Sequence, residues 1–225
     1  HVVDAPATLT EPMRLQFGLQ ATPIRPLPPH ELGNLYQKQG VFTDEAFYQE
    51  LEQWGCRGAI YYYAWRGNPR SELGGTPEPP RDPRQIERIK TATAMAHAHG
   101  MLTLTYTGWG VNANSENWKR FGHELGAYPV ENKGWGTYRQ SAGLRGGYGD
   151  FMAWGHAMLA REYGLDGVLW DSTGNLGPDR NLRTGNAWID REGRVRKQYA
   201  VRATRDLYRR VYNVYKSEAN DTGIV

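Results

Sequence analysis

The sequence has very little cysteine. Cys56 is the only cysteine among 225 residues, so the chain can form neither an internal disulfide bond nor a metal site built from cysteines alone. No run of about 20 apolar residues occurs, which excludes a membrane-spanning helix. The His-Glu-x-x-His, Walker and paired-cysteine patterns are also missing. We therefore expect a globular protein that uses no metal, no cofactor and no membrane.

A strong charge of either sign is missing as well. The 27 basic and 24 acidic residues leave a net charge of +3, and they are mixed except in the basic stretch "DREGRVRKQYAVRATRDLYRR". Mixed charge of this kind is typical of a solvated hairpin and helix, so we expect no nucleic-acid partner. No charged-then-apolar leader opens the chain at His1, and we expect a secretion signal to be removed or to lie on a longer parent, with an extracellular or periplasmic location.

Tryptophan and tyrosine are what the sequence has in excess. It contains 8 Trp and 14 Tyr but only 5 Phe. Both side chains combine an apolar face with a polar group, which suits a half-wet surface such as a cleft that binds sugar rings. The alternative is that these rings simply fill the core.

Helix-like and strand-like stretches alternate along the chain. The helices expected with clear ends are "FTDEAFYQELEQWG" (N-cap Thr43), "DPRQIERIKTATAMAHAHG" (N-cap Asp82), "YGDFMAWGHAMLAREYG" (ending at Gly164) and "VRATRDLYRRVYNVYKSE". The helix "SENWKRFGHELGA" is expected to open at Ser115. The strands expected are 13–21, "GAIYYYAWRGN", "MLTLTYTGWG", "WGTYRQSA", "GLDGVLWDST" and the start of one more at "TGIV", with a hairpin at "WIDREGRVRKQ".

This alternation predicts a parallel sheet covered by helices. The long loops follow strands, including a rigid proline-rich loop over 22–43, whereas the links from helix to strand are as short as one or two residues. A (β/α)8 barrel builds its site from loops after strands, and the first strand lacks the glycine-rich fingerprint of a doubly wound sheet. We predict an α/β fold of the TIM type, an incomplete (β/α)8 barrel of about five βα units plus the start of a sixth strand. Residues 1–12 are expected to be a linker from a preceding domain and 13–225 the partial barrel catalytic domain.

The stretch "GLDGVLWDST" carries the candidate catalytic residue. Asp171 ends an apolar strand on the face of the barrel where sites are built, and alternation puts it on the same side as Leu169 and opposite Trp170. A carboxylate there fits the nucleophile or the cation stabiliser of glycosyl transfer. The alternative is that Asp171 caps its own loop. Asp166, at the start of the strand, is expected to be a turn residue at the structural bottom of the barrel.

Several segments carry a family resemblance. The stretches "RLQFGLQATPIRP", "YRQSAGLRGGYGDFMAWGHAMLAREYGLDGVLWDST" and "RATRDLYRRVY" resemble uncharacterised relatives of family 123 glycoside hydrolases, over about 15–212. "LDGVLWDS" also resembles the strand-end Asp of the α-galactosidase superfamily, where this position carries the nucleophile. Family 123 uses an adjacent Asp-Glu pair, but Ser172 follows Asp171 here, so substrate-assisted catalysis is not expected. The α-galactosidase resemblance implies an acid/base carboxylate from a later strand, beyond Val225.

Other side chains complete the predicted site. The alternative acid/base groups within the chain are Asp179, Asp190 and Glu192, from the loop and hairpin after Asp171. The expected substrate-binding residues are Tyr61, Tyr63, Trp65, Arg66, Tyr106, Trp109, Arg139 and Trp170. The two arginines could bind an acidic sugar or pair with a loop carboxylate. His97 and His99 are expected to stabilise the C-terminal end of their helix rather than to bind a metal.

Together these features predict a glycoside hydrolase that acts on oligo- or polysaccharide. The partners expected are its carbohydrate substrate, the remaining barrel strands and a β-sandwich domain on the parent chain. One alternative is a catalytically silent, carbohydrate-binding barrel, which would keep the aromatics but lack a second carboxylate near Asp171. Another is a metabolic barrel for phosphorylated ligands, which would need a glycine-rich phosphate site after late strands.

Overall fold

A computed structural model describes residues 8, 35–39, 42–62, 82–107, 110–112, 120, 128–132, 137–141, 147–170, 182, 187–197 and 201–218. Of 36–39, 62, 110–112, 128–132 and 137–141 it describes the backbone only. Contacts divide the chain into the units His1–Glu31 and Leu32–Val225. The strand expected at 13–21 and the final "TGIV" lie outside the described residues. No helix within the described ranges is both long and apolar enough to cross a membrane.

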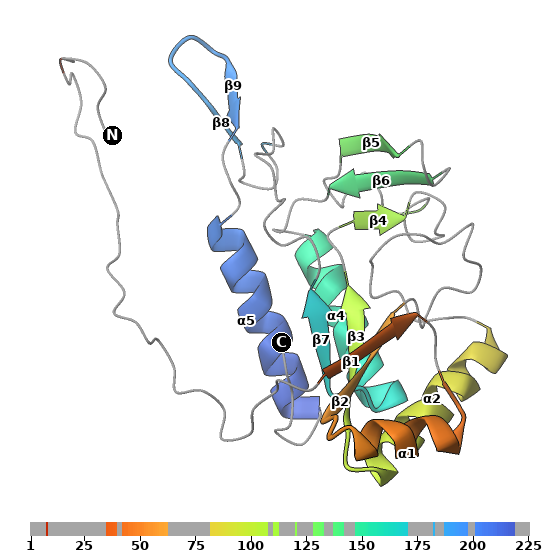
Figure 1. Ribbon diagram of the computed structural model, residues 1–225. Coiled ribbons are helices and arrows are strands. Elements are labelled where there is room, and N and C mark those ends of the chain that lie inside the picture. The colour runs from red at the N-terminus through yellow and green to blue at the C-terminus, as the bar shows by residue number, and fades with distance from the viewer. Residues whose placement is uncertain are drawn as a thin grey trace. The chain divides into compact units, whose positions relative to one another are not determined.

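The second unit contains a four-stranded parallel sheet (Figure 1). Its strands are β1 (Leu35–Gln39), β2 (Gly58–Tyr62), β3 (Leu102–Thr107) and β7 (Gly167–Trp170), hydrogen-bonded in the order β1-β2-β3-β7. Neighbours in this sheet follow one another along the chain. A barrel has such a sequential order, whereas a doubly wound sheet reverses direction at a switch point. The described strands therefore have the arrangement expected of part of a barrel wall.

Within the described ranges, four helices accompany the sheet: α1 (Glu45–Gln53), α2 (Pro83–Ala98), α4 (Gly147–Tyr163) and α5 (Val201–Glu218). The predicted cap of α2 is confirmed, because the Asp82 carboxylate accepts a hydrogen bond from the Arg84 N–H and Pro83 opens the helix. The predicted cap of α1 is wrong by one residue. Asp44, not Thr43, is the N-cap residue, and its carboxylate accepts a hydrogen bond from the Ala46 N–H at 3.1 Å.

Glycines end two of these helices as predicted. Gly55 follows α1 with a φ of 71° and Gly164 follows α4 with a φ of 72°. A backbone with positive φ costs a residue with a Cβ atom about 1 kcal/mol or more, which glycine avoids. Each glycine turns the chain back from a helix into the next strand of the sheet.

The parallel register separates the two faces of the sheet. Thr105 pairs with Val168 and Tyr61 with Thr105, and these side chains share one face. Val168 packs with Met152, Leu207 and other apolar side chains of α4 and α5, so this face is covered by helices. Ile60, Leu104, Tyr106 and Leu169 share the opposite face, which is the inner face in a barrel. The predicted orientation of Leu169, opposite Val168 and Trp170, is therefore confirmed.

Two smaller groups of strands lie outside the parallel sheet. β4 (Gly110–Asn112), β5 (Tyr128–Asn132) and β6 (Thr137–Ser141) form an antiparallel sheet in the order β4-β6-β5. β8 (Ala187–Ile189) and β9 (Val195–Lys197) form a hairpin that turns through Gly193, at a φ of 76°. The strand predicted in "WGTYRQSA" and the hairpin are both confirmed.

One predicted loop contains a strand. The range 22–43 was expected to be irregular because of its prolines, but β1 lies within it and pairs with β2 over five residues. The stretch LYQKQ has little apolar character, so no periodicity signals burial. Among the described strands β1 has a single neighbour, and an edge strand needs fewer apolar residues than a central one.

Candidate functional site

The carboxyl ends of β3 and β7 define the candidate site. Thr107 and Trp170 are register partners at this edge, and Tyr106 pairs with Leu169 one residue earlier on the inner face. Tyr106 is buried, with 8% of its surface exposed. Ligand sites of parallel α/β folds lie at this edge, beyond the last residues of the strands. At this edge Tyr106 lies on the same face of the sheet as Leu169, and Trp170 lies on the face of Val168.

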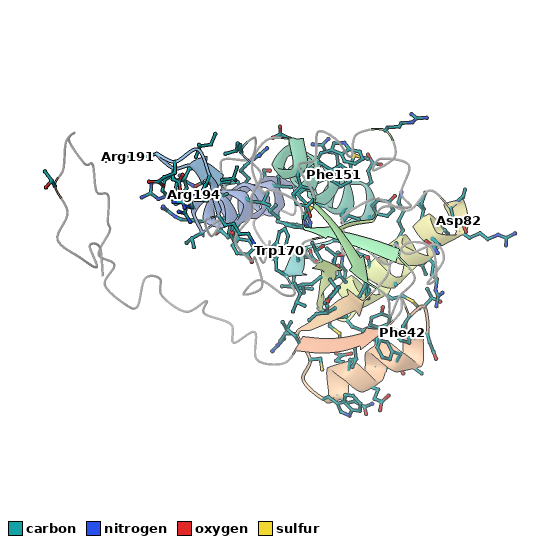
Figure 2. All side chains as sticks on the ribbon, turned by 90° about the horizontal axis from the view of Figure 1, so that it is seen from above. Phe42, Asp82, Phe151, Trp170, Arg191 and Arg194 are labelled. Carbon is teal, nitrogen blue, oxygen red and sulfur yellow. The ribbon has the colours of Figure 1, made fainter. Side chains whose placement is uncertain are left out.

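Trp170 is held from behind by the rings of His156 and Tyr208. The centroid of each ring lies 5.2 Å from that of Trp170, and Tyr208 meets it edge-on. His156 Nδ1 lies 3.0 Å from the Tyr215 hydroxyl oxygen, which joins α4 to α5. Figure 2 shows Trp170 between the sheet and these helices. The rings fix the last residue of β7, which directly precedes Asp171.

His156 is neutral in this position. Its side chain is completely buried, and burial lowers the pKa of His156 to about 3. Its Nε2 has no hydrogen-bond partner in the described part of the chain. His156 therefore supports the strand end and does not exchange protons near pH 7. His156 is not among the residues predicted from the sequence, although a histidine inside the apolar stretch "FMAWGHAMLA" was the available signal.

The low pKa of His156 predicts acid sensitivity. An unfolded chain takes up a proton at this residue near pH 6.5, whereas the folded chain does not until about pH 3. Unfolding is therefore favoured increasingly as the pH falls from about 6.5 to 3. We expect the unfolding free energy of His156→Phe to fall less steeply with decreasing pH than that of the wild type, between about pH 6.5 and 4. Urea titrations over this range measure the slope; equal slopes in both proteins would refute a buried neutral histidine.

Tyr61 and Tyr106 lie on opposite faces of the sheet. Tyr61 is 1% exposed, and its hydroxyl oxygen lies 3.0 Å from that of Tyr48 on α1. Burial, followed by the charge and hydrogen bond of Tyr48, raises the pKa of Tyr61 far above its usual range. Trp170 also faces the helices. Of these three predicted substrate-binding residues, only Tyr106 shares the face of Leu169, which would be the inner face in a barrel.

Asp190 and Glu192 lie in the β8–β9 hairpin. Desolvation tends to raise the pKa of Asp190, but hydrogen bonds from the Arg194 backbone and from the Arg196 and Arg194 side chains outweigh it and lower the pKa to about 2. A carboxylate with so low a pKa holds no proton for a leaving group at neutral pH. Glu192 is exposed and lies 2.7 Å from Arg194 Nη2. This environment argues against Asp190 as the general acid.

Several predicted site residues lie outside the described part of the chain. These are Asp171, Tyr63, Trp65, Arg66, Trp109 and Asp179. Arg139 is in β6, where its backbone pairs with Asn112 and Val130. The roles predicted for all of them remain predictions.

Asp166 and two histidines mark the opposite edge of the sheet. The Asp166 Oδ2 accepts hydrogen bonds from the Thr103 N–H at 2.7 Å and the Thr103 hydroxyl at 3.0 Å, and lies 2.8 Å from His97 Nε2. His99 lies between the carboxylates of Glu45 and Glu52. Within the described ranges, no three His, Cys, Asp or Glu side chains could hold a metal ion together. Asp166 therefore ties β7 to β3 at the amino ends of the strands, at the predicted end of the barrel.

Known proteins resemble this chain in the arrangement of strands and helices but not in sequence. No protein-family model and no curated protein matches the sequence. Among solved structures, a cycloisomaltooligosaccharide glucanotransferase from Paenibacillus sp. superimposes with a TM-score of 0.54 at 14% identity, over 83% of this chain and 29% of that protein. A dextranase of glycoside hydrolase family 31 from Flavobacterium johnsoniae gives 0.51 at 14% identity, over 83% and 24%. An α-amylase from Geobacillus thermoleovorans gives 0.51 at 11% identity, over 79% and 38%.

These similarities concern the fold. The solved structures include TIM-barrel glycoside hydrolases, and the chain is an α/β protein with a parallel sheet like theirs. It spans between 24 and 38% of the length of these three proteins. The coarse prediction of a glycosidase-type α/β fold is confirmed. The resemblances to family 123 and to α-galactosidases stay predictions.

Proposed function

We propose that the chain is part of the catalytic barrel of a glycoside hydrolase that acts on oligo- or polysaccharide. The observation that supports this most is the sequential parallel sheet, whose carboxyl edge at Thr107 and Trp170 immediately precedes the candidate carboxylate Asp171. The fold likeness to glycoside hydrolases adds to it. Further strands, from outside the described residues or from a longer parent chain, would complete the barrel.

Asp171 takes the central chemical role in this proposal. In an extended strand, residues two apart share a face, so a continuation of β7 would orient Asp171 as Leu169 is oriented, toward the inner side. A carboxylate there would attack the anomeric carbon or stabilise the oxocarbenium-like transition state. In a retaining enzyme the acid/base carboxyl group lies about 5 Å away, and in an inverting one about 6.5–9.5 Å. We place that group beyond Val225 or at Asp179 or Glu192 rather than at Asp190.

Hydrolysis of chromogenic glycosides tests the proposal. The full-length protein that contains this chain should release the aryl group from at least one member of a panel of aryl glucosides, galactosides, N-acetylgalactosaminides and uronides. Reducing-end assays on dextran, starch and polyuronates extend the panel to polymers. Binding of a polymer in affinity electrophoresis without cleavage of any substrate would overturn the enzymatic proposal and favour the catalytically silent, carbohydrate-binding barrel. Neither binding nor cleavage would overturn both.

A further inference from the structure

The β8–β9 hairpin exposes large apolar side chains among positive charges. Trp188 is 51% exposed and Ile189 57%. The eleven residues 187–197 contain four basic and two acidic side chains, a net charge of +2. Single exposed apolar residues are ordinary, but an exposed tryptophan beside basic side chains is a typical contact surface. The exposed indole and the positive charges of this hairpin therefore fit a ligand that offers both an apolar face and negative charge.

Trp188 and Arg196 are direct cross-strand partners. The register pairs Trp188 with Arg196, and directly opposite residues of an antiparallel pair project to the same side. The Asp190 Oδ2 accepts hydrogen bonds from Arg196 Nε at 2.6 Å and from Arg194 Nε at 3.1 Å. The Asp190 side chain is only 7% exposed, whereas those of Arg196 and Arg194 are 47% and 60% exposed. A nearly buried carboxylate thus orients two exposed guanidinium groups beside an exposed indole.

This arrangement leaves donors of Arg196 available. Asp190 binds Arg196 through Nε, and within the described residues no hydrogen bond or ion pair engages the two Nη groups of Arg196. Figure 2 shows Arg191 and Arg194 on the same hairpin. Arg191 and Lys197 make no ion pair in the described part of the chain and add positive potential. Because Arg196 is already ordered, a bound anion pays less side-chain entropy than at a free arginine.

We propose that the hairpin is a binding site for an acidic polysaccharide, in which a uronate ring stacks on Trp188 and its carboxylate binds the Nη groups of Arg196. The indole offers the apolar face that the C–H groups of a sugar ring need, and the guanidinium binds a carboxylate through two parallel hydrogen bonds. The inference rests on the proposed function only in taking a carbohydrate as the ligand. It extends that function to a substrate class, anionic glycans.

Affinity electrophoresis and calorimetry with polygalacturonate and alginate test this site without any turnover. The full chain should bind both polymers, and Trp188→Ala and Arg196→Gln should each weaken binding by about ten-fold, the effect of one charged hydrogen bond or one stacking contact. Matched controls are Trp54→Ala, which removes a tryptophan that is 56% exposed, and Arg84→Gln on α2. Both controls should bind as the wild type does. The readout is binding without turnover, so a loss of binding in Trp188→Ala or Arg196→Gln tests this site alone and leaves the glycosidase proposal to its own cleavage assay.

Three results would overturn the proposal. The first is equal binding by Trp188→Ala, Arg196→Gln and the wild type. The second is equal affinity for dextran and polygalacturonate, which would remove the requirement for an anionic sugar. The third is binding of heparin or single-stranded DNA with the same affinity and the same dependence on Trp188, which would make the hairpin a general polyanion surface.

Discussion

Asp171→Asn is expected to reduce turnover of any glycoside that the full-length protein cleaves by about 10³-fold or more, the scale at which removal of a group that contacts the reacting atoms usually acts. The substitution keeps the size of the side chain and removes its charge. Neither attack on the anomeric carbon nor stabilisation of a cationic transition state survives that loss. Initial rates on the best substrate of the panel, with circular dichroism to confirm folding, measure it.

A second variant separates the two roles of Asp171. If the residue is a nucleophile, Asp171→Gly with added azide should regain part of the lost rate, because azide fits the vacated space and attacks the sugar in place of the carboxylate. If it stabilises charge only, azide should not restore turnover. Asp150→Asn is the matched control, since Asp150 is 70% exposed and pairs with Arg210 on the surface. A rate in Asp171→Asn close to that of Asp150→Asn would move the chemistry to another carboxylate.

Sequence periodicity predicted the described helices well because their signals are local. Caps such as Asp82 and terminators such as Gly164 act within one turn of the helix they bound, and both are where the sequence placed them. Alternation also predicted that Leu169 lies opposite Val168 and Trp170 in β7, and the register shows this arrangement. Which face meets the helices did not follow from the uninterrupted apolar run "VLW"; Val168 packs against α4 and α5.

The orientation of β2 was not predictable from its sequence. "GAIYYYAW" is apolar and aromatic without interruption, so both faces of the strand are covered and alternation does not tell which tyrosine faces inward. The hydroxyl of Tyr48, 13 positions away in the chain, decides it by bonding to Tyr61 on the helix side. His156 was missed for the same reason. Its role depends on Trp170 and Tyr215, neither of which is near it in sequence.

Among the proposed substitutions, Asp166→Ala is expected to lower the unfolding free energy most. Asp166→Ala removes the acceptor of a buried backbone N–H and of the Thr103 hydroxyl, and two buried donors without a partner cost about 3 kcal/mol of unfolding free energy. Asp150→Asn, on the surface, should change it by less than about 0.5 kcal/mol. Urea denaturation monitored by tryptophan fluorescence compares the two. A loss in Asp166→Ala as small as in the control would mean that water replaces the carboxylate at this edge.

The third partner of Asp166 makes part of this stability depend on pH. The hydrogen bond that His97 donates to the Asp166 carboxylate is the main cause that raises the pKa of His97 above its usual value, against the opposite effect of burial. A histidine whose pKa is raised by folding stabilises the folded state fully below its unfolded pKa of about 6.5 and loses that contribution as the pH rises through the folded value. His97 is 42% exposed, so solvent screens the pair and the contribution is well below that of the Thr103 bonds. The difference in unfolding free energy between wild type and His97→Gln should therefore shrink above pH 6.5, and a difference that stays constant with pH would show that His97 supports Asp166 by packing rather than by charge.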